Sequence, residues 1–195
     1  MRHLVVTQNV TLDGSPEMLT DWFLPQGQGL GDEPVDDSDQ LEAISRQDST
    51  ADALLVGRRT FQDFRSYWRD LEGDTTGISD HLNSVQKYVV SSTLTEPDWQ
   101  YTTVLSGDPV EQVRALKQQA GRDIVLTGSI SLSHALIAAG LVDEYRLFTY
   151  PAVQGSGRPL FPDGHQVPRL RLLDATSFRN GVTLTRYAST GRSRS

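Results

Sequence analysis

Residues 123–153 show a strand, a helix and a second strand in direct succession, and this pattern constrains the fold more than any other feature of the chain. An apolar run at 123–127 (DIVLT) precedes a helical stretch over about 130–139. Gly140 ends that stretch, and a second apolar run occupies 143–153. Two strands joined through a helix lie parallel in one sheet, with a right-handed crossover. The segment therefore predicts an α/β fold built on a parallel sheet.

The rest of the chain repeats this alternation of strands and helices. Apolar or alternating runs predict strands at about residues 3–10, 53–56, 86–91 and 100–105. Helical periodicity predicts helices at about residues 40–50, 60–68 and 109–120. The polar, glycine-containing stretch 69–84 is expected to be a loop.

The three predicted helices begin at residues that can accept hydrogen bonds from free backbone amides. Ser38 or Asp39 is expected to cap the first helix, and Thr60 the second. Asp108 is expected to cap the third helix, with Pro109 at its first position. In the second helix, bulky aromatic residues at helical spacing are expected to face the core: Phe61, Phe64 and Trp68.

The C-terminal part predicts an antiparallel hairpin, so the sheet should be mixed. Two alternating segments, at about 169–177 and 182–189, are joined by Asn180 and Gly181, a pair that tolerates the positive φ angles of a tight turn. After them the polar tail 190–195 is expected to be disordered. These observations predict one folded domain over residues 1–189.

A second segment is expected to be mobile. Residues 25–39 (PQGQGLGDEPVDDSD) are rich in glycine, proline and aspartate and have few apolar anchors. Such a composition cannot bury enough surface to offset the entropy lost on ordering.

Composition limits the classes of function. The chain has 195 residues, enough for one sizeable core, and no cysteine, which excludes disulfides and thiolate sites. A net charge of −7 disfavours a protein that binds nucleic acid through phosphate neutralisation. Neither a membrane-spanning run nor an export leader is found, so we expect a cytoplasmic protein whose partner is a small molecule.

The first candidate site follows the strand at 53–56. Gly57, Arg58, Arg59 and Thr60 bring free backbone amides, two guanidinium groups and a hydroxyl to the start of a helix. A helix N-terminus and arginine side chains both favour phosphate. The alternative is that the arginines are solvated surface residues and that Thr60 is only a cap.

Two more strand ends have similar chemistry. Ser91, Ser92 and Thr93 place three hydroxyl groups after one strand, although such a triplet also forms turns by binding its own backbone. The segment 127–130, consisting of Thr127, Gly128, Ser129 and Ile130, joins another strand to a helix, and Gly128 either allows a close approach of a ligand or accommodates a sharp turn. Ligands of open α/β sheets bind at the carboxyl ends of strands. The three turns together therefore favour a phosphate-bearing cofactor.

Other residues are weaker candidates. Asp13, in the turn after the first strand, can orient a substrate or hold a proton, but it is also an ordinary turn residue. Trp22 and Phe23 can wall a pocket for a flat ring or fasten a loop to the core. The histidines show no metal-ligand spacing and are expected to have surface or capping roles: His3, His81, His134 and His165. No metal site is predicted.

The order of several short motifs resembles the dihydrofolate reductase fold, and more closely the family that shares the reductase domain of riboflavin biosynthesis. The resemblance covers most of residues 2–188. It is carried by VTLDG at 10–14, LLVGRRTF at 54–61, KYVVSSTL at 87–94, DIVLTGSISLSHAL at 123–136, GLVDEYRLFTYP at 140–151, GSGRPLF at 155–161 and RNGVTLTRY at 179–187. It implies a three-layer α/β/α domain with a mixed, mostly parallel sheet and an antiparallel C-terminal hairpin.

The resemblance also implies a cofactor, NADPH, and places it on the turns described above. The element at 57–60 would contact the adenosine 2′-phosphate and the pyrophosphate, the serines at 91 and 92 the adenosine side, and the turn at 127–130 the pyrophosphate. The backbone of Gln8 and Asn9 would approach the nicotinamide, with Asp13 beside the substrate cavity.

The chain departs from the family in two places. Where the family usually has two consecutive glycines, this chain has Thr127 and Gly128. The helical carboxylate that protonates the pterin in dihydrofolate reductases has no convincing match, although Asp39, Glu42 and Asp48 are near.

The resulting expectation is an NADPH-dependent reductase that transfers a hydride to a small pterin- or pyrimidine-type heterocycle. Its alternatives are a nucleotide-binding module of the same fold without turnover, and a pocket for another phosphorylated metabolite. A homodimer is also expected, through the antiparallel edge and the GSGRPLF region, because dimers are common among similar proteins.

Overall fold

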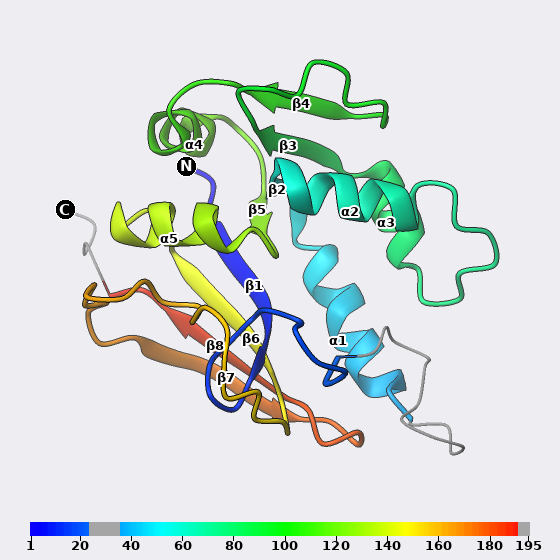
Figure 1. Cartoon of the computed structure of the whole chain (residues 1–195), viewed down its shortest axis with the longest axis vertical. Helices are drawn as coiled ribbons and strands as arrows, with labels where there is room; N and C mark the ends of the chain where they lie inside the picture. Colours follow the sequence, from blue (N-terminus) through cyan, green and yellow to red (C-terminus); the bar gives the residue numbers. More distant parts are fainter. Residues whose placement is uncertain (24–35, 191–195) are drawn as a thin grey trace.

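The computed structural model describes residues 1–23 and 36–190, which form one mixed sheet flanked by helices (Figure 1). The strands, in the order β4-β3-β2-β5-β1-β6-β8-β7 across the sheet, are β1 (Leu4–Thr11), β2 (Ala51–Gly57), β3 (Gln86–Val90), β4 (Thr102–Leu105), β5 (Asp123–Leu126), β6 (Glu144–Tyr150), β7 (Arg171–Ser177) and β8 (Thr183–Ala188). The helices are α1 (Ser38–Asp48), α2 (Arg58–Trp68), α3 (Ile78–Ser84), α4 (Pro109–Gln118) and α5 (Ile130–Ala138).

The strand-helix-strand unit is confirmed. β5 and β6, which α5 connects, both pair parallel with β1, which lies between them. In this register Val5 is opposite Val125, and Asn9 is opposite Phe148. The parallel part of the sheet runs from β4 to β6, and the antiparallel part begins where β6 meets β8.

The three-layer arrangement is confirmed as well: α1, α2 and α3 cover one face of the sheet, and α4 and α5 cover the other (Figure 1). Alternate residues of β2 pack on opposite faces of the sheet, because successive side chains of a strand point in opposite directions. Leu55 joins the core under α4 and α5, whereas Leu54 and Val56 join the core under α2 and α3. A third cluster joins α1, through Ala43, to the C-terminal hairpin.

The hairpin turn is wider than a two-residue turn. Phe178 donates from its backbone amide to Val182 at 2.8 Å, so three residues lie between the paired ends. Gly181 has a φ angle of +85°, and Asn180 does not have a positive φ. Asn180 accepts from the Val182 amide at 3.0 Å instead, because its short side chain reaches back onto its own turn.

The expected loop at 69–84 is wrong in its second half, which forms α3. Asp74 organises the entry to this helix: its carboxylate accepts from the amide and the hydroxyl of both Thr76 and Ser79. Ile78 and Leu82, four residues apart, pack on the core under α2. The helix spans only seven residues, so its apolar periodicity is too short to stand out in the sequence.

Of the three expected caps, the one for α2 is wrong, the one for α1 is confirmed only in part and the one for α4 is confirmed. The residue before α2 is Gly57, and Thr60 lies within the first turn. The residue before α1 is Asp37, and the Ser38 hydroxyl donates to Asp36 at 2.6 Å, although Asp39 accepts from the Gln40 amide at 3.0 Å. The Asp108 carboxylate accepts from the Glu111 amide at 3.0 Å, as predicted for α4.

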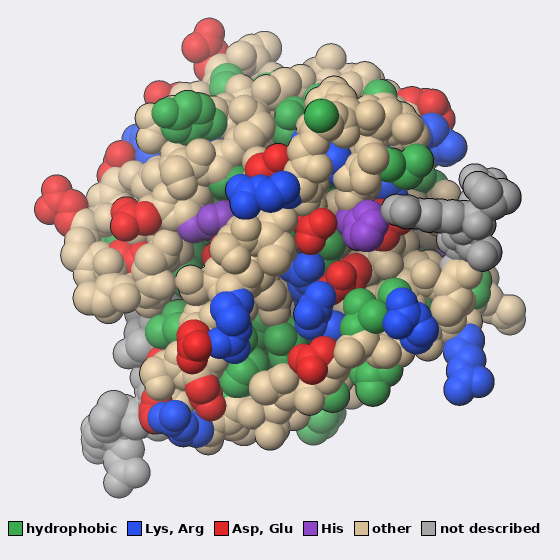
Figure 2. Space-filling model, turned by 180° about the vertical axis from the view of Figure 1, so that it is seen from behind, with side chains coloured by type: hydrophobic (Ala, Val, Ile, Leu, Met, Phe, Trp, Pro, Cys, Tyr) green, Lys and Arg blue, Asp and Glu red, His purple; other side chains and the backbone are tan. Residues whose placement is uncertain are grey.

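Two expectations fall partly outside the residues that the structure describes. These are the segment expected to be mobile, from 25 to 35, and the tail, from 191 to 195. Within the described ranges, no helix is long and apolar enough to cross a membrane. Figure 2 shows acidic and basic side chains interspersed over the face seen from behind.

Candidate cofactor and substrate site

The three polar turns singled out in the sequence lie together at the carboxyl-terminal ends of the strands that precede them. Gly57 ends β2 opposite Val90 of β3, and β5 lies on the other side of β2. The Gly57 amide donates to the Ser129 hydroxyl at 2.8 Å, so the first and third turns are in direct contact. The carboxyl ends of β2, β3 and β5 therefore form one continuous polar edge.

Part of the predicted phosphate-binding capacity is used within the protein. The Ser129 amide and hydroxyl both donate to the Thr60 hydroxyl, at 3.0 and 2.9 Å. The Gln8 side chain donates to the Gly128 carbonyl at 2.6 Å and accepts from the Gly128 amide at 3.2 Å. The amides of Gly57, Gly128 and Ser129 are thus occupied, and these contacts hold the N-termini of α2 and α5 together.

Arg58 and Arg59 are the charged groups that remain available at this edge. Both are exposed at the N-terminus of α2, and their side chains make no hydrogen bond or ion pair with another residue that the structure describes. The first amides of a helix also lack intrahelical acceptors. The start of α2 therefore presents two cations and the positive end of a helix dipole to solvent.

Gly128 is required by the contact between the two helices. Its φ angle is +58°, and a Cβ added there would lie 2.8 Å from Cγ2 of Thr60. Ser129 follows with a φ angle of +50°. Of the two explanations that the sequence left open, the sharp turn is confirmed: the glycine allows Thr60 and Ser129 to interlock. Whether it also admits a ligand stays a prediction.

The serine-rich turn after β3 is divided between two roles. The buried Ser91 hydroxyl accepts from the amides of Thr93 and Leu94, at 3.2 and 3.0 Å, so it builds the turn. Ser92 and Thr93 are exposed. Ser92 and Thr93 therefore offer exposed hydroxyls at this turn, whereas the Ser91 hydroxyl already accepts two bonds, and its role in cofactor binding stays a prediction.

A cavity of about 320 Å³ lies between the sheet and the helices α1, α2 and α3. Residues of β1, β2, β5 and β6 line it on the sheet side, and at one end it reaches the turn at 127–128. Most of the lining is apolar or aromatic. The residues that line it are Thr7, Gln8, Asn9, Pro16, Met18, Phe23, Ile44, Asp48, Ala53, Leu54, Phe64, Trp68, Ile78, His81, Leu82, Val125, Thr127, Gly128 and Phe148.

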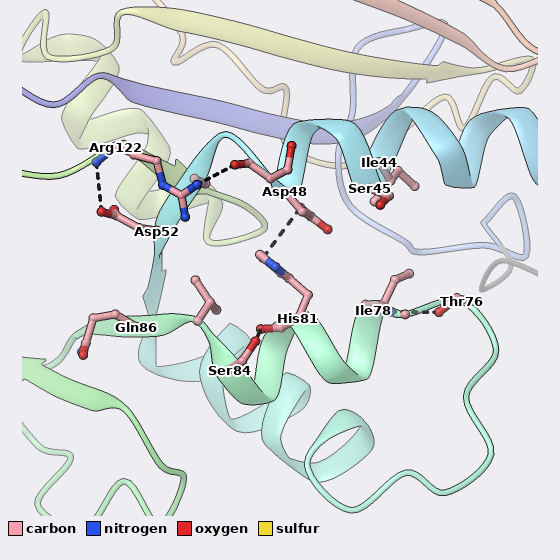
Figure 3. Close-up of a pocket in the computed structure, with 14 residues that line it drawn as sticks. Ile44, Ser45, Asp48, Asp52, Thr76, Ile78, His81, Ser84, Gln86 and Arg122 are labelled. Atoms are coloured by element: carbon pink, nitrogen blue, oxygen red, sulfur yellow. Dashed lines mark hydrogen bonds and ion pairs between the residues drawn. The ribbon is translucent and has the colours of Figure 1, made fainter.

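A second, polar pocket of about 500 Å³ adjoins this cavity near the amino-terminal ends of β2 and β3. The two share Ile44, Asp48, Ile78 and His81. Figure 3 shows Asp48 of α1 and His81 of α3 facing one another across the gap, with Oδ1 and Nε2 separated by 3.7 Å. Arg122 also lines this pocket, and its guanidinium donates to the Ser49 carbonyl at 2.8 Å.

The environment of Asp48 changes its acidity. Burial raises the pKa of the Asp48 carboxyl, and the positive charges of His81 and Arg146 offset only part of that effect. A carboxyl of this kind holds a proton to higher pH than an exposed aspartate does. Perturbed carboxyls in clefts are typical of functional sites.

Asp13 has the opposite environment. Its carboxylate accepts from the amides of Gln154 and Gly155, at 3.2 and 2.8 Å, and it does not line the cavity. Hydrogen bonds from the Thr11 side chain and from those two amides lower the pKa of Asp13 to about 2. The carboxylate is therefore ionised at neutral pH and fastens the loop after β6. Its predicted catalytic role remains a prediction, but these contacts give no support to it as a proton donor.

Trp22 and Phe23 take both of the roles that the sequence allowed. Each packs edge-on against Tyr150, with ring centroids 5.3 and 5.6 Å apart. The Trp22 indole also donates to the Gln154 side chain at 2.9 Å. These contacts fasten the segment to β6, while Phe23 forms part of the cavity wall.

Sequence reasoning missed the pair formed by Asp48 and His81. The sequence predicts a surface or capping role for His81 and matches Asp48 to no motif. The two lie 33 positions apart and are brought together only by the packing of α1 and α3. Among the residues that the structure describes, no cluster of acidic residues and histidines is arranged to hold a metal ion.

The fold defines a class of protein. The eight-stranded sheet, mostly parallel and ending in an antiparallel C-terminal hairpin, is that of a dihydrofolate reductase-like domain. Within this class, the model of the RibD C-terminal domain family matches residues 2–184, and the chain belongs to that family.

Known relatives agree with this assignment. YyaP of Bacillus subtilis, an uncharacterized protein, is 33% identical over 191 residues, which cover 95% of this chain and 94% of YyaP. A putative riboflavin biosynthesis protein from Shewanella sp. PV-4 superposes with a TM-score of 0.68 at 20% identity, covering 95% of this chain and 98% of its own. A pyrimidine reductase-like protein from Corynebacterium diphtheriae has a TM-score of 0.64 at 18% identity, covering 98% and 93%.

Proposed function

We propose that this protein is an NADPH-dependent reductase of a small heterocycle of the pterin or pyrimidine type. Membership in the RibD C-terminal domain family supports a reductase-type role. The cofactor assignment depends on Arg58 and Arg59 at the N-terminus of α2, beside the polar carboxyl edge. Both are exposed, and neither forms an ion pair with an acidic residue in the ranges 1–23 and 36–190. The fold shared with a pyrimidine reductase-like protein agrees with the proposed substrate class.

The donor set fits a phosphorylated dinucleotide. Arg58 and Arg59 would hold the 2′-phosphate, and the free amides at the start of α2 would hold the pyrophosphate. Ser92 and Thr93 offer hydroxyls to the adenosine side. When bound, the cofactor supplies a hydride, and the protein supplies orientation and exclusion of water.

The cavity fits the heterocycle. Its aromatic and aliphatic walls suit a flat ring, and Asn9 and Thr127 supply polar groups that would fix the orientation of that ring. A proton must accompany the hydride when a C=N or C=O bond is reduced. Asp48, with His81 beside it, is the group in the cavity wall whose environment favours holding that proton.

The cofactor assignment is tested by titration calorimetry with NADPH and NADH. The double variant Arg58→Ala/Arg59→Ala should weaken NADPH binding by about 10- to 100-fold, as expected for loss of charge-assisted bonds to a phosphate, and NADH binding much less. Arg169→Ala is a matched control, because Arg169 is exposed and lies outside the proposed site. Equal losses for both cofactors would contradict the assignment.

Turnover is tested by following NADPH oxidation with a panel of pterins and pyrimidines. Oxidation that depends on one of these compounds supports the reductase. NADPH binding without oxidation by any member of the panel would favour a nucleotide-binding module. Absence of NADPH binding at millimolar concentrations would overturn the proposal and leave the site to another phosphorylated metabolite.

A further inference from the structure

The wall shared by the apolar cavity and the polar pocket is formed by four residues, and two of them can carry a proton. Ile44 and Ile78 form the apolar part of this wall, and Asp48 and His81 form the polar part. Both titratable side chains are partly buried, with 30% of Asp48 and 27% of His81 exposed. Because each of them lines both spaces, the pair connects the apolar cavity with the polar pocket.

The two spaces extend toward opposite ends of the parallel strands. The apolar cavity reaches the turn at 127–128, after β5, where the cofactor is proposed to bind. The polar pocket is lined by Ala51 and Asp52 at the start of β2 and by Gln86 at the start of β3. Because β2, β3 and β5 are parallel, their amino-terminal ends lie away from the cofactor turns. A cofactor bound at those turns would therefore leave the polar pocket open to water.

The polar pocket offers hydrogen-bonding groups to water. Ser45 and Ser84 are exposed at its rim, and Thr76 also lines it. Figure 3 shows His81 and Asp48 facing each other beside these residues. A polar space of about 500 Å³ is large enough for several water molecules. Water in this pocket can exchange protons with the His81 ring.

The separation of the pair suits a proton transfer that follows substrate binding. Nε2 of His81 and Oδ1 of Asp48 are 3.7 Å apart, which is an ion-pair distance but longer than a direct hydrogen bond. A small rotation of either side chain brings these atoms within hydrogen-bond distance. Catalytic hydrogen bonds are often long before the substrate binds and shorten afterwards.

The other charged groups around the pair have partners elsewhere. They are Asp52, paired with Arg2; Arg122, whose guanidinium donates to the Ser49 carbonyl at 2.8 Å; and Arg146, which binds Glu144 and Asp123. Within the ranges that the structure describes, the His81 side chain forms an ion pair with Asp48 and with no other acidic residue. A proton that leaves His81 for a carboxylate therefore goes to Asp48.

We propose that His81 relays protons: it takes a proton from water in the polar pocket and passes it to Asp48, which gives a proton to the substrate in the apolar cavity. The inference rests on the proposed reductase function. In each turnover Asp48 loses its proton to the substrate atom that becomes negative as the hydride adds, and the His81 ring restores that proton. Water then reprotonates the ring. One proton is consumed for each hydride, so the pair returns to its starting state.

The first test compares NADPH oxidation by the parent and by His81→Gln, with the compound of the panel that the parent reduces. Glutamine keeps a polar side chain but cannot relay a proton. We expect kcat to fall at least about 10-fold at pH 7, while KM and NADPH affinity stay within about 2-fold. The loss should grow as pH rises, because protons supplied directly by the solvent become scarcer.

His165→Gln is the control for this comparison. His165 is exposed and lines neither space, so its replacement should leave kcat unchanged. A kcat that is also unchanged in His81→Gln overturns the relay.

Chemical rescue tests whether the His81 ring acts through Asp48. His81→Ala leaves a gap beside the polar pocket that free imidazole can enter, so added imidazole should restore much of the lost kcat. It should not restore kcat in the double variant Asp48→Asn/His81→Ala, because the proton acceptor is missing. The double variant should also be no slower than Asp48→Asn alone, as expected for two residues on one route. Equal rescue of both variants would show that imidazole bypasses Asp48, which would overturn the relay.

A purely structural role for His81 gives a different set of results. In that case kcat falls together with NADPH affinity and the urea midpoint, and imidazole does not rescue His81→Ala; this outcome overturns the proposal. If His81→Ala does not fold, the solvent isotope effect on kcat replaces the rescue. It should be larger in His81→Gln than in the parent, because proton delivery then limits the rate, and equal isotope effects count against the relay.

The parent protein separates this proposal from the proposed function. If the parent oxidises NADPH with no compound of the panel, the reductase function and the relay are overturned together. If the parent turns over and the His81 variants behave like it, the relay alone is overturned and the reductase function stands.

Discussion

At the scale of single residues, two aspartates near the candidate site have opposite environments. Asp13 is exposed and bonded to backbone amides, which lowers its pKa to about 2, whereas burial raises the pKa of Asp48. Such a difference in pKa suits two chemically identical groups to different roles. Asp13 is suited to fastening a loop, and Asp48 is suited to exchanging a proton.

Asp13→Asn should lower stability only where the carboxylate is ionised. A group whose pKa is lower in the folded state contributes stability above its unfolded pKa, and that contribution is lost as pH falls through the folded pKa. The urea midpoints of the parent and the variant should therefore differ at pH 7 and converge as pH falls from 3.8 toward about 2. A pH-independent difference would mean that the lost bonds do not depend on the charge.

Asp48→Asn should have the reverse effect on stability. Because the folded-state pKa of Asp48 is raised, its ionised form carries a penalty that grows as pH rises through that pKa and is complete above it. Removing the charge should raise the thermal midpoint at pH 7 by about 2 °C or more, while NADPH oxidation falls.

The exposed Glu42, on the same helix, provides the control for Asp48→Asn. Glu42→Gln should not raise the thermal midpoint and should leave turnover unchanged. A lower midpoint for Asp48→Asn at pH 7 would show that its ion pair with His81 outweighs its burial.

The same residues show how far the site could be predicted from sequence. Arg58, Thr60 and Ser129 were identified because strand-to-helix turns have a local signature, and the structure places them together. Their internal bonds were not predictable, because the contact between Thr60 and Ser129 joins residues 69 positions apart. The pair of Asp48 and His81 was missed for the same reason.

At the scale of elements, local signals predicted long helices and strands well and short connections poorly. α4 has a cap, a proline at its first position and regular periodicity, and all three were recognised. α3 lacks these signals, because it spans only seven residues and follows Gly77, which has no side chain to cap it. Ile78 and Leu82 pack it against the core under α2, and a helix stabilised by such packing is not visible in local propensity.

Lys87 of β3 joins that strand to α3. Its buried ammonium group donates to the carbonyls of Leu82 and Val85, at 2.7 and 2.9 Å, and lies 4.7 Å from the ring centroid of Trp99. Burial lowers the pKa of Lys87 from 10.5 to about 8. Between these values the unfolded chain binds more protons than the folded one, so stability should rise with pH.

Urea unfolding of the parent and of Lys87→Met between pH 8 and 10.5 tests this expectation. The parent should gain stability across this range relative to the variant, because methionine cannot titrate. All other groups are the same in both proteins, so the difference between the two profiles isolates Lys87. Parallel profiles would contradict a lowered pKa at this position.

At the scale of the whole molecule, the central question is how the antiparallel hairpin is joined to the parallel sheet. The sequence predicted both parts, but it contained no information on the pairing across their junction. In the observed register Arg146 of β6 lies directly opposite Arg186 of β8. Two cations in such positions repel each other unless an anion lies between them.

Glu144 is that anion. Its Oε1 atom accepts from Nε of Arg146 at 2.8 Å and from Nε of Arg186 at 2.9 Å. Burial alone would raise the pKa of Glu144, but the hydrogen bonds and charges of the two arginines hold it below its usual range. Arg146 reaches further to Asp123 of β5 at 3.1 Å, so the network ties β5, β6 and β8 across the sheet.

Glu144→Gln should therefore destabilise the whole fold rather than one loop. The variant leaves two arginines, one of them buried, opposite each other without their shared anion. Breaking a buried ion pair in this way lowers the free energy of unfolding by about 3 kcal/mol. Urea unfolding should remain a single transition with a lower midpoint. Glu42→Gln, which breaks an exposed pair with Arg46, is the control and should cost about 0.5 kcal/mol or less. Similar costs for the two variants would mean that the junction is held by the backbone ladder and the apolar cluster of Phe148 and Leu184, with the ion network contributing little.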